Sequence, residues 1–288
     1  MPIAPDGGVL KNIWVPLSAA ISQQRNVDTI ANNVANANTP GFKKDQLVFK
    51  EYLTTLDKGH YEIDQPHREW KPGDFYRSYG AENSYVQVDG SFTNFKQGQL
   101  TPTRNPFDIA VQGKGFFEIL TPNGIRYSRK GSFSLSREGE LVTDQGYKVL
   151  GKLNPKQLEE KVDPGKPPIS PADRVIKFET SGRPTVNLQG EVYVRGQKIA
   201  DLSVVEFKDP HALYKEGNSM YINKGNENIS TRPNQSAIYQ GFVEESNVNA
   251  VAEMSNLIKA HRHFESIQKA IKTYDTISGR GVNDIAKF

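Results

Sequence analysis

The C-terminal stretch Ala250–Tyr274, AVAEMSNLIKAHRHFESIQKAIKTY, carries the strongest periodicity in the chain. Its apolar residues recur three or four positions apart, which is the spacing of one face of an α-helix. The members of this stripe are Ala250, Met254, Leu257, Ala260, Phe264, Ile267, Ile271 and Tyr274. Acidic and capping residues, which favour a helix N-terminus, come just before it. They are Glu244, Glu245, Ser246, Asn247 and Asn249. We therefore predict an amphipathic helix that ends at about Gly279.

A second stripe lies near the other end of the chain, between Leu10 and Val34. Its apolar residues are three, four or seven positions apart, so we predict a helix of about 25 residues there. These residues are Ile13, Leu17, Ala20, Val27, Ile30, Ala31 and Val34. The sequence Asn38-Thr39-Pro40-Gly41 predicts the end of this helix near Asn38. The reason is that proline pushes the residue before it out of the helical conformation, and glycine tolerates the turn that follows.

The middle of the chain has short alternating apolar segments separated by turn sequences such as Thr121-Pro122-Asn123-Gly124. Alternation with a period of two predicts strands, and closely spaced turns predict antiparallel pairing. The segments are Phe107–Val111, Phe117–Ile119, Tyr127, Phe133–Leu135, Leu141–Val142, Val186–Leu188, Val192–Val194 and Leu202–Val204. We expect surface loops at 152–174, which is rich in proline, and at 223–236, which is rich in asparagine.

These patterns predict an α+β fold, in which the N- and C-terminal helices form a coiled layer and the centre is an antiparallel all-β domain. The expected segments are an N-terminal helix (1–41), an extended connector (42–80), a β-rich outer domain (81–240) and a C-terminal helix (241–288). Each stripe needs a partner, because an isolated amphipathic helix is marginal in water. The partner is the other terminal helix, the β domain or further copies of the chain. Helices at the two extreme ends favour a coiled layer of their own.

Composition excludes several classes of protein. Thirty-six Lys and Arg against 33 Asp and Glu give a net charge of +3, which is too balanced for a nucleic-acid-binding surface. No apolar run approaches the length of about 18 residues that a membrane-spanning helix needs, so we expect no such helix. With no cysteine, the chain forms no disulfide and no thiolate site. The N-terminus lacks the plan of a cleaved secretory signal.

The sequence offers little for catalysis or for binding a metal or a cofactor. His261 and His263 are two positions apart and point to different sides of a helix, so they do not share a metal. Ser266 and Lys269 match the SxxK spacing of serine hydrolases, but the partner motifs of those enzymes are missing. We expect no enzyme activity, no cofactor and no metal. A serine hydrolase that uses Ser266 and a monomeric periplasmic binding module are the alternatives.

Three motifs together resemble the signatures of the bacterial flagellar basal-body rod protein family. The N-terminal motif is Asp28–Asn36 (DTIANNVAN), which runs into Thr39–Lys43 (TPGFK). The central motif consists of Asn105–Val111 (NPFDIAV), Gly113–Phe117 (GKGFF) and Tyr127–Phe133 (YSRKGSF). The C-terminal motif is Gly241–Asn249 (GFVEESNVN), with Met254, Ile258, Arg262, Phe264 and Glu265. The matches lie at both ends and in the middle, so the resemblance covers most of the chain.

Within this family, the length and the central motif resemble the proximal and distal rod proteins. Val251–Ser255 and the tail 275–284 are more similar to the proximal rod protein, which we favour. Tyr239–Glu244 and Val48–Leu53 are more similar to the distal one, which is the alternative.

The resemblance implies a mechanical function without turnover. The terminal helices would pair into the coiled inner layer of an axial assembly that transmits torque from motor to hook, with the β domain outside. The implied partners are copies of this chain, neighbouring rod or hook-basal-body subunits, and the type III export apparatus. The implied location is the flagellar basal body in the periplasmic space, reached without a cleaved signal peptide. We also expect the helices to be disordered in the monomer and to fold on assembly.

The resemblance also implies roles for particular residues. The implied subunit-interface residues are Ile13, Leu17, Val27, Ile30, Asn32, Asn33, Val34, Asn36, Ser246, Asn247, Val248, Met254, Leu257, Phe264 and Ile271. Among these, Asn32, Asn33 and Asn36 would bridge neighbouring helices. The implied chain turn towards the β domain consists of Thr39, Pro40, Gly41 and Phe42.

Overall fold

The computed structural model describes residues 8–54, 83–152, 170–178, 182–230 and 235–285. The chain divides into two compact units, each built from segments that are far apart in the sequence. Unit 1 takes residues 1–34, 45–92 and 250–288, and unit 2 takes residues 35–44 and 93–249. The predicted α+β class with an antiparallel β domain is confirmed.

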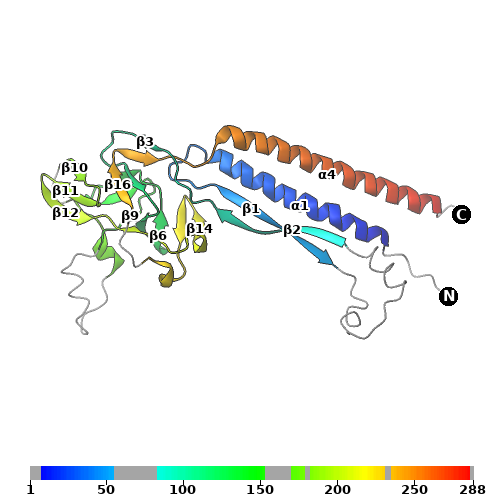
Figure 1. The fold of residues 1–288 in the computed structure, drawn as a ribbon, viewed down its shortest axis with the longest axis horizontal. Helices are drawn as coiled ribbons and strands as arrows, with labels where there is room; N and C mark the ends of the chain where they lie inside the picture. Colours follow the sequence, from blue (N-terminus) through cyan, green and yellow to red (C-terminus); the bar gives the residue numbers. More distant parts are fainter. Residues whose placement is uncertain (1–7, 55–82, 153–169, 179–181, 231–234, 286–288) are drawn as a thin grey trace, which may run out of the picture. The chain divides into compact units, whose positions relative to one another are not determined.

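Unit 1 holds two long helices and a two-stranded sheet. Helix α1 (Gly8–Ala35) and helix α4 (Ala250–Ile285) run antiparallel along each other, and strands β1 (Asp45–Thr54) and β2 (Asn83–Thr93) lie along α1 (Figure 1). The described part of the expected connector is therefore largely a strand, and residues 55–80 of that connector lie outside the described residues. Residues 83–92, expected in the β-rich domain, belong to unit 1 with the helices.

Both helices differ from the prediction at their C-terminal ends. Helix α1 ends at Ala35, because the backbone turns at the next residues: the N–H of Thr39 donates to the carbonyl of Asn36 at 3.1 Å. Helix α4 continues through Gly279 to Ile285. A glycine inside a helix costs only about 1 kcal/mol relative to alanine, so without a left-handed cap it does not end one.

Unit 2 is built around one large antiparallel sheet. Its strand order is β14-β15-β6-β5-β9-β8-β7, and β13 also pairs with β5. These strands are β5 (Phe116–Thr121), β6 (Gly124–Ser128), β7 (Phe133–Leu135), β8 (Leu141–Thr143), β9 (Lys148–Val149), β13 (Val204–Val205), β14 (Tyr214–Gly217) and β15 (Met220–Ile222).

Three small sheets complete unit 2, and two of them bring residues near 240 back to residues near 100. A three-stranded sheet has the order β10-β11-β12, and two-stranded sheets join β16 to β4 and β17 to β3. The strands are β3 (Leu100–Pro102), β4 (Ile109–Gln112), β10 (Pro184–Val186), β11 (Glu191–Val194), β12 (Gln197–Asp201), β16 (Ala237–Gln240) and β17 (Phe242–Glu244). The expected C-terminal helical segment from residue 241 thus begins with a strand, β17.

The expected loops contain short helical turns. The 152–174 segment ends in the 3-10 helix η2 (Pro171–Arg174), which Ser170 caps with its side chain, while 153–169 lie outside the described residues. The 223–236 segment holds the 3-10 helix η4 (Asn226–Asn228), and 231–234 lie outside the described residues. A third 3-10 helix, η3 (Pro210–Ala212), precedes β14.

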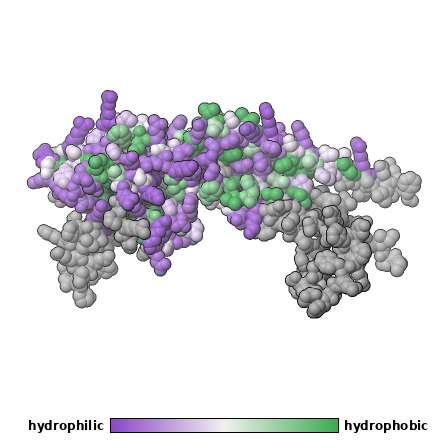
Figure 2. Space-filling model, in the orientation of Figure 1, coloured by the Kyte–Doolittle hydropathy of each residue, from purple (hydrophilic) through white to green (hydrophobic). Residues whose placement is uncertain are grey.

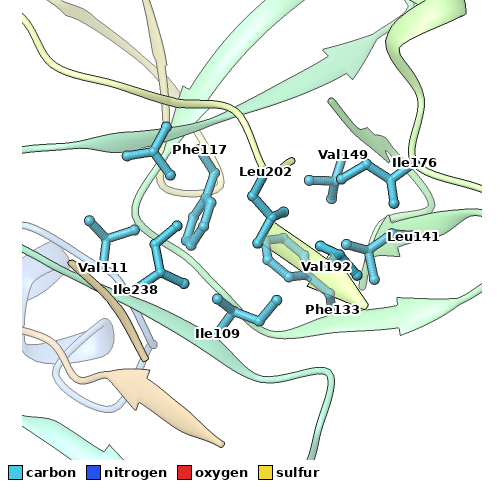
Figure 3. Packing of buried hydrophobic residues seen from close by; sticks show 11 residues of the cluster. Ile109, Val111, Phe117, Phe133, Leu141, Val149, Ile176, Val192, Leu202 and Ile238 are labelled. Carbon is cyan, nitrogen blue, oxygen red and sulfur yellow. The ribbon is translucent and has the colours of Figure 1, made fainter. Parts of the chain in front are cut away.

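The main core of unit 2 lies where the large sheet meets β4, β11 and β16. Figure 3 shows its side chains converging on one interior. Phe117 and Phe133 pack edge to face, with ring centroids 5.2 Å apart. The cluster consists of Ile109, Val111, Phe117, Phe133, Leu141, Val149, Ile176, Val192, Leu202, Val204 and Ile238. A second cluster consists of Phe116, Tyr127, Phe207, Leu213 and Tyr221.

The three-stranded sheet carries a carboxylate whose pKa is strongly lowered, that of Glu191 in β11. It accepts hydrogen bonds from Lys198 Nζ at 2.5 Å, Tyr193 Oη at 2.9 Å and Asn187 Nδ2 at 2.6 Å. These bonds, that from Lys198 first, lower the pKa of Glu191 to about 2. The ionised form is therefore favoured in the folded state.

We expect this carboxylate to make unit 2 less stable in acid. Because the folded pKa lies below the unfolded value of 4.5, the stabilisation is present above pH 4.5 and is lost as the pH falls towards 2. Thermal melting of wild type and Glu191→Gln at pH 7, 4 and 3 measures the effect. Between pH 7 and pH 3, the melting temperature of Glu191→Gln should fall less than that of wild type. Glu227→Gln, at an exposed position, is the control. An equal fall in the melting temperatures of wild type and Glu191→Gln would contradict the prediction that ionised Glu191 stabilises unit 2.

Candidate subunit interface and chain junction

Helix α1 has partners on two sides within unit 1. On one side Gln23 Nε2 donates to the carbonyl of Ala260 in α4 at 3.0 Å. On the other side Ser22 Oγ donates to the carbonyl of Val86 in β2 at 2.9 Å. Of the predicted interface residues, Leu17, Val27, Ile30 and Val34 are half-buried, and the side chain of Ile13 is outside the described residues. The α1 stripe thus finds much of its cover inside its own chain.

Asn33 has a role that the sequence analysis did not predict. Its side chain is 1% exposed and forms a two-way pair with the backbone of Asp45. Nδ2 donates to the carbonyl of Asp45 at 2.8 Å, and the N–H of Asp45 donates to Oδ1 at 3.0 Å. The amide therefore joins the end of α1 to the start of β1 in the same chain. Both of its polar atoms are bonded to Asp45, whereas it was predicted to bridge to a neighbouring helix. Asn32 is exposed, and Asn36 Oδ1 accepts from Thr39 Oγ1 at 3.2 Å.

Helix α4 has two apolar stripes rather than the one that was predicted. The inner stripe is buried or half-buried and consists of Leu257, Ala260, Phe264, Ile267 and Ile271. Met254, which was predicted to belong to it, is 51% exposed and lies on another face of the helix. Tyr274 keeps the spacing of three from Ile271 and is 48% exposed. The turn of about 100° per residue places Met254 about 120° around the helix from Ala260.

The second stripe, which we call the outer stripe, consists of Val251, Met254 and Ile258. These side chains are 75%, 51% and 56% exposed, and their spacing of three and four places them on one helical face. Figure 2 shows apolar surface among polar residues over the helices. Contiguous exposed apolar side chains are characteristic of surfaces that bind a partner.

In unit 2, three segments meet at what we call the junction: residues 41–44, 94–99 and 244–247. The N–H of Gly41 donates to the carbonyl of Glu244 at 2.7 Å, and that of Glu245 donates to the carbonyl of Gln99 at 2.8 Å. Residues 41–44 follow α1 in the chain, and residues 244–247 precede α4. The two segments that lead to the helices therefore lie side by side on the β domain.

The side chain of Asn247 connects all three junction segments. Its Oδ1 accepts from the N–H of Lys44 at 2.8 Å, and its Nδ2 donates to the carbonyl of Asn94 at 2.7 Å and to that of Lys96 at 3.0 Å. The predicted role of Asn247 at the helix start is therefore replaced by a role in the junction. Nearby, Ser246 Oγ accepts from the N–H of Val248, which is 9% exposed.

The predicted chain turn at Thr39–Phe42 needs a glycine. Gly41 has φ +69°, and a Cβ there would lie 2.5 Å from the backbone nitrogen of Lys130. A side chain at this position would meet both a strained backbone and a direct clash. The next residue, Phe42, is 3% exposed, and Lys215 Nζ lies 4.1 Å from the centre of its ring.

The junction encloses a cluster of three charged residues, which we call the buried charge cluster: Lys43, Arg129 and Glu244. The side chains of Lys43 and Glu244 are fully buried and that of Arg129 is 2% exposed. Lys43 Nζ donates to Glu244 Oε1 at 2.5 Å and to the carbonyl of Lys96 at 2.8 Å. Glu244 Oε1 also accepts from the N–H of Gly98 at 2.9 Å.

Arg129 approaches the same carboxylate from the large sheet. Its Nη1 lies 3.4 Å from Glu244 Oε2 and 3.3 Å from the carbonyl of Val111, and its Nη2 donates to the carbonyl of Gly113. Its guanidinium lies 4.9 Å from the centre of the Phe116 ring. Burial lowers the pKa of Lys43 and that of Arg129, while the Glu244 carboxylate opposes both shifts. The Glu244 carboxylate thus stabilises the charged forms of both buried cations.

The residues considered for catalysis do not form a site in the described part of the chain. Ser266 Oγ donates to the carbonyl of Arg262 at 2.9 Å on the exposed side of α4, and His261 and His263 are also exposed. Among the described residues, no three His, Cys, Asp or Glu side chains are grouped to hold a metal. None of the described helices combines the length and the apolar character needed to cross a membrane.

Comparison with known families identifies these elements. A family model for "Flagella basal body rod protein" matches residues 15–43, and one for the C-terminal region of flagellar basal body rod FlgEFG proteins matches residues 239–285. A model for the D1 domain of flagellar hook protein FlgE/F/G matches residues 110–194. The flagellar basal-body rod protein FlgG of Borreliella burgdorferi is 31% identical over 279 residues, 94% of this chain and 97% of that protein. The chain belongs to the flagellar basal-body rod protein family.

Relatives of two kinds are equally similar to this rod-family chain. FlgG of Buchnera aphidicola is 30% identical over 277 residues, 93% of this chain and 96% of that protein. FlgF of Mesorhizobium japonicum is 31% identical over 255 residues, 88% of this chain and 89% of that protein. The chain is accordingly a structural rod subunit of the flagellar basal body, which assembles with other rod subunits.

The buried charge cluster was not predicted from the sequence, although its members lie in the three motifs that carry the resemblance. Glu244 was assigned to the start of the C-terminal helix because acidic residues favour helix N-termini. A signal was present, since each of the three charged residues lies within two positions of an aromatic residue, Phe42, Tyr127 or Phe242. A charge inside such a motif indicates a buried partner elsewhere in the chain.

We expect Glu244→Gln to destabilise unit 2 by about 3 to 5 kcal/mol, because it leaves Lys43 and Arg129 buried without their anion. Urea denaturation followed by tyrosine fluorescence measures the change, because Tyr127, Tyr193 and Tyr221 lie in unit 2. The neighbouring exposed Glu245→Gln, whose amide oxygen can still accept from Thr101 Oγ1, is the matched control and should change stability by less than about 0.5 kcal/mol. Equal unfolding midpoints for the two variants would show that the carboxylate charge is dispensable.

Proposed function

We propose that this rod subunit polymerises through its terminal helices into the axial shaft that transmits torque from motor to hook. The observation that supports it is the outer stripe of α4. Its three exposed apolar side chains are separated from the stripe that faces the chain's own α1. Burying the part of each side chain that is still exposed would contribute about 1 to 2 kcal/mol, so their cover by neighbouring subunits would favour a stable polymer.

Torque transmission requires stiffness along the shaft rather than chemistry. Helices packed side by side are stiff because their backbone hydrogen bonds lie inside each segment and their side chains interlock between segments. In this role the chain works without turnover, cofactor or metal. The family and the exposed position of Ser266 support this role over a serine hydrolase.

We also propose a location and a route. The subunit is exported by the type III apparatus of the flagellum and assembles in the periplasmic part of the basal body. We assign it to the proximal part of the rod, on the sequence of Val251–Ser255 and the tail 275–284. Relatives named FlgF and FlgG match this chain equally well, so the distal position is the alternative.

We expect Met254→Asp to prevent assembly while leaving the subunit folded. Met254 is already half-exposed in the single chain, so a carboxylate there costs little until a neighbour has to cover it. Sedimentation of concentrated protein and electron microscopy of isolated basal bodies measure assembly, and circular dichroism checks the fold. Ser266→Asp adds the same charge at an exposed position about 120° around α4 and is the matched control. Normal rods with Met254→Asp would remove the outer stripe from the interface.

We further expect hydrogen exchange to show that α1 and α4 fold on assembly. In the isolated subunit, amides of α1 and α4 should exchange faster than those of the core strands β5 and β8. The stripe of α1 is mostly half-buried and much of α4 is exposed, whereas most apolar side chains of β5 and β8 are buried. After assembly the same amides should become protected. Helices that are as protected as the core strands in the isolated subunit would show that they fold before assembly.

A further inference from the structure

Beyond its role in assembly, the structure points to a function for the buried charge cluster. We propose that Lys43, Arg129 and Glu244 form a register clasp. It fixes the pairing of the three junction segments, so that the two helical segments leave the β domain from defined points. Its contribution is the choice of one arrangement over others rather than net stability. Of the experiments described below, only the assembly assay rests on the proposed function.

The composition of the cluster argues against a purely stabilising role. Two cations and one anion are removed from water together, and Arg129 Nε is buried without a hydrogen-bond acceptor. The cost of removing ions from water is often as large as the attraction between them, so apolar residues of similar volume are frequently at least as stable. Selection of one arrangement is a role that buried ionic groups have in other proteins, and we assign it to this cluster.

The register of the strands at the junction is weakly determined by apolar burial. Strand β17 pairs with β3 over three residues only, with Phe242 opposite Pro102 and Glu244 opposite Leu100. A slip by two residues would leave every side chain on the same face of the ladder, so apolar burial alone distinguishes the registers poorly. Such a slip would move the Glu244 carboxylate by about 7 Å, away from Lys43 Nζ and the N–H of Gly98.

The contacts of Lys43 and Glu244 penalise every wrong register. Lys43 Nζ bonds both to the carboxylate and to the carbonyl of Lys96, and Glu244 bonds both to Lys43 and to the N–H of Gly98. Any shift of one segment therefore leaves a buried charge without its partner. The close backbone approach supports the same register, because a Cβ on Gly98 would lie 2.0 Å from the carbonyl oxygen of Glu245.

The decisive experiment uses the full chain and compares three variants by hydrogen exchange. Glu244→Asp keeps the charge but shortens the side chain by one methylene group. The triple variant Lys43→Met, Arg129→Leu, Glu244→Met removes all charges together. Leu141→Ala, in the core strand β8, is the control for a general loss of stability. The readout is the protection of the amides of Gly41, Lys44 and Glu245, whose acceptors are not the substituted side chains, relative to that of the β5 amides.

In the two cluster variants, protection of the junction amides should fall about tenfold or more relative to that of β5. In Leu141→Ala the junction and β5 should lose protection in parallel. Junction protection that stays at the wild-type ratio in Glu244→Asp would overturn the proposal. So would a triple variant in which all of unit 2 loses protection equally, because that result would make the cluster a stabiliser only. If the triple variant does not fold, Glu244→Asp decides alone.

Assembly provides the last readout and separates this inference from the proposed function. Both cluster variants should assemble poorly although their β5 amides stay protected. Met254→Asp should instead keep full junction protection and lose assembly. If Met254→Asp assembles normally, the proposed role of the helices fails while the junction result still stands. If the cluster variants assemble as well as wild type, the clasp is not needed for the rod.

Discussion

The carboxylate of Glu244 is the group on which the arrangement of the junction depends. It is fully buried, it accepts from Lys43 and from the N–H of Gly98, and it faces Arg129. A buried anion must be matched by donors with correct geometry, and here the donors come from three separate places in the chain. The three junction segments can form these bonds together only when each of them lies in its proper place.

The long helices could largely be predicted from the sequence, because a helix is determined by residues that are near one another in the chain. The stripe of Leu257, Phe264 and Ile271 predicted α4, and the turn sequence after residue 38 predicted the exit from α1. What failed were details set by tertiary context. Gly279 did not end α4, and Met254 proved to be exposed, since a spacing of three or four fits two neighbouring stripes on one helix.

The pairing of strands β16 and β17 and the charge cluster could not be predicted from local patterns, because both join residues that are far apart in the sequence. Strands β16 and β17 are short, and their partners β4 and β3 lie more than 120 residues away in the sequence. Lys43 and Glu244 are separated by 201 positions, so no window along the chain contains both. The local sequence suggests another role for each residue. Lys43 resembles a surface lysine after a turn, and Glu244 resembles an acidic residue at the N-terminus of a helix.

The two kinds of surface in this subunit suit two different tasks. Inside the junction the contacts are polar, directional and buried, so they favour one arrangement and penalise its neighbours. On the outer face of α4 the exposed side chains are apolar, and apolar contact is non-directional and tolerates small differences in the geometry of the partner. The partners that the family implies are other rod subunits. Directional polar bonds therefore suit the fixed pairing of segments inside unit 2, whereas an exposed apolar face suits contact with another subunit.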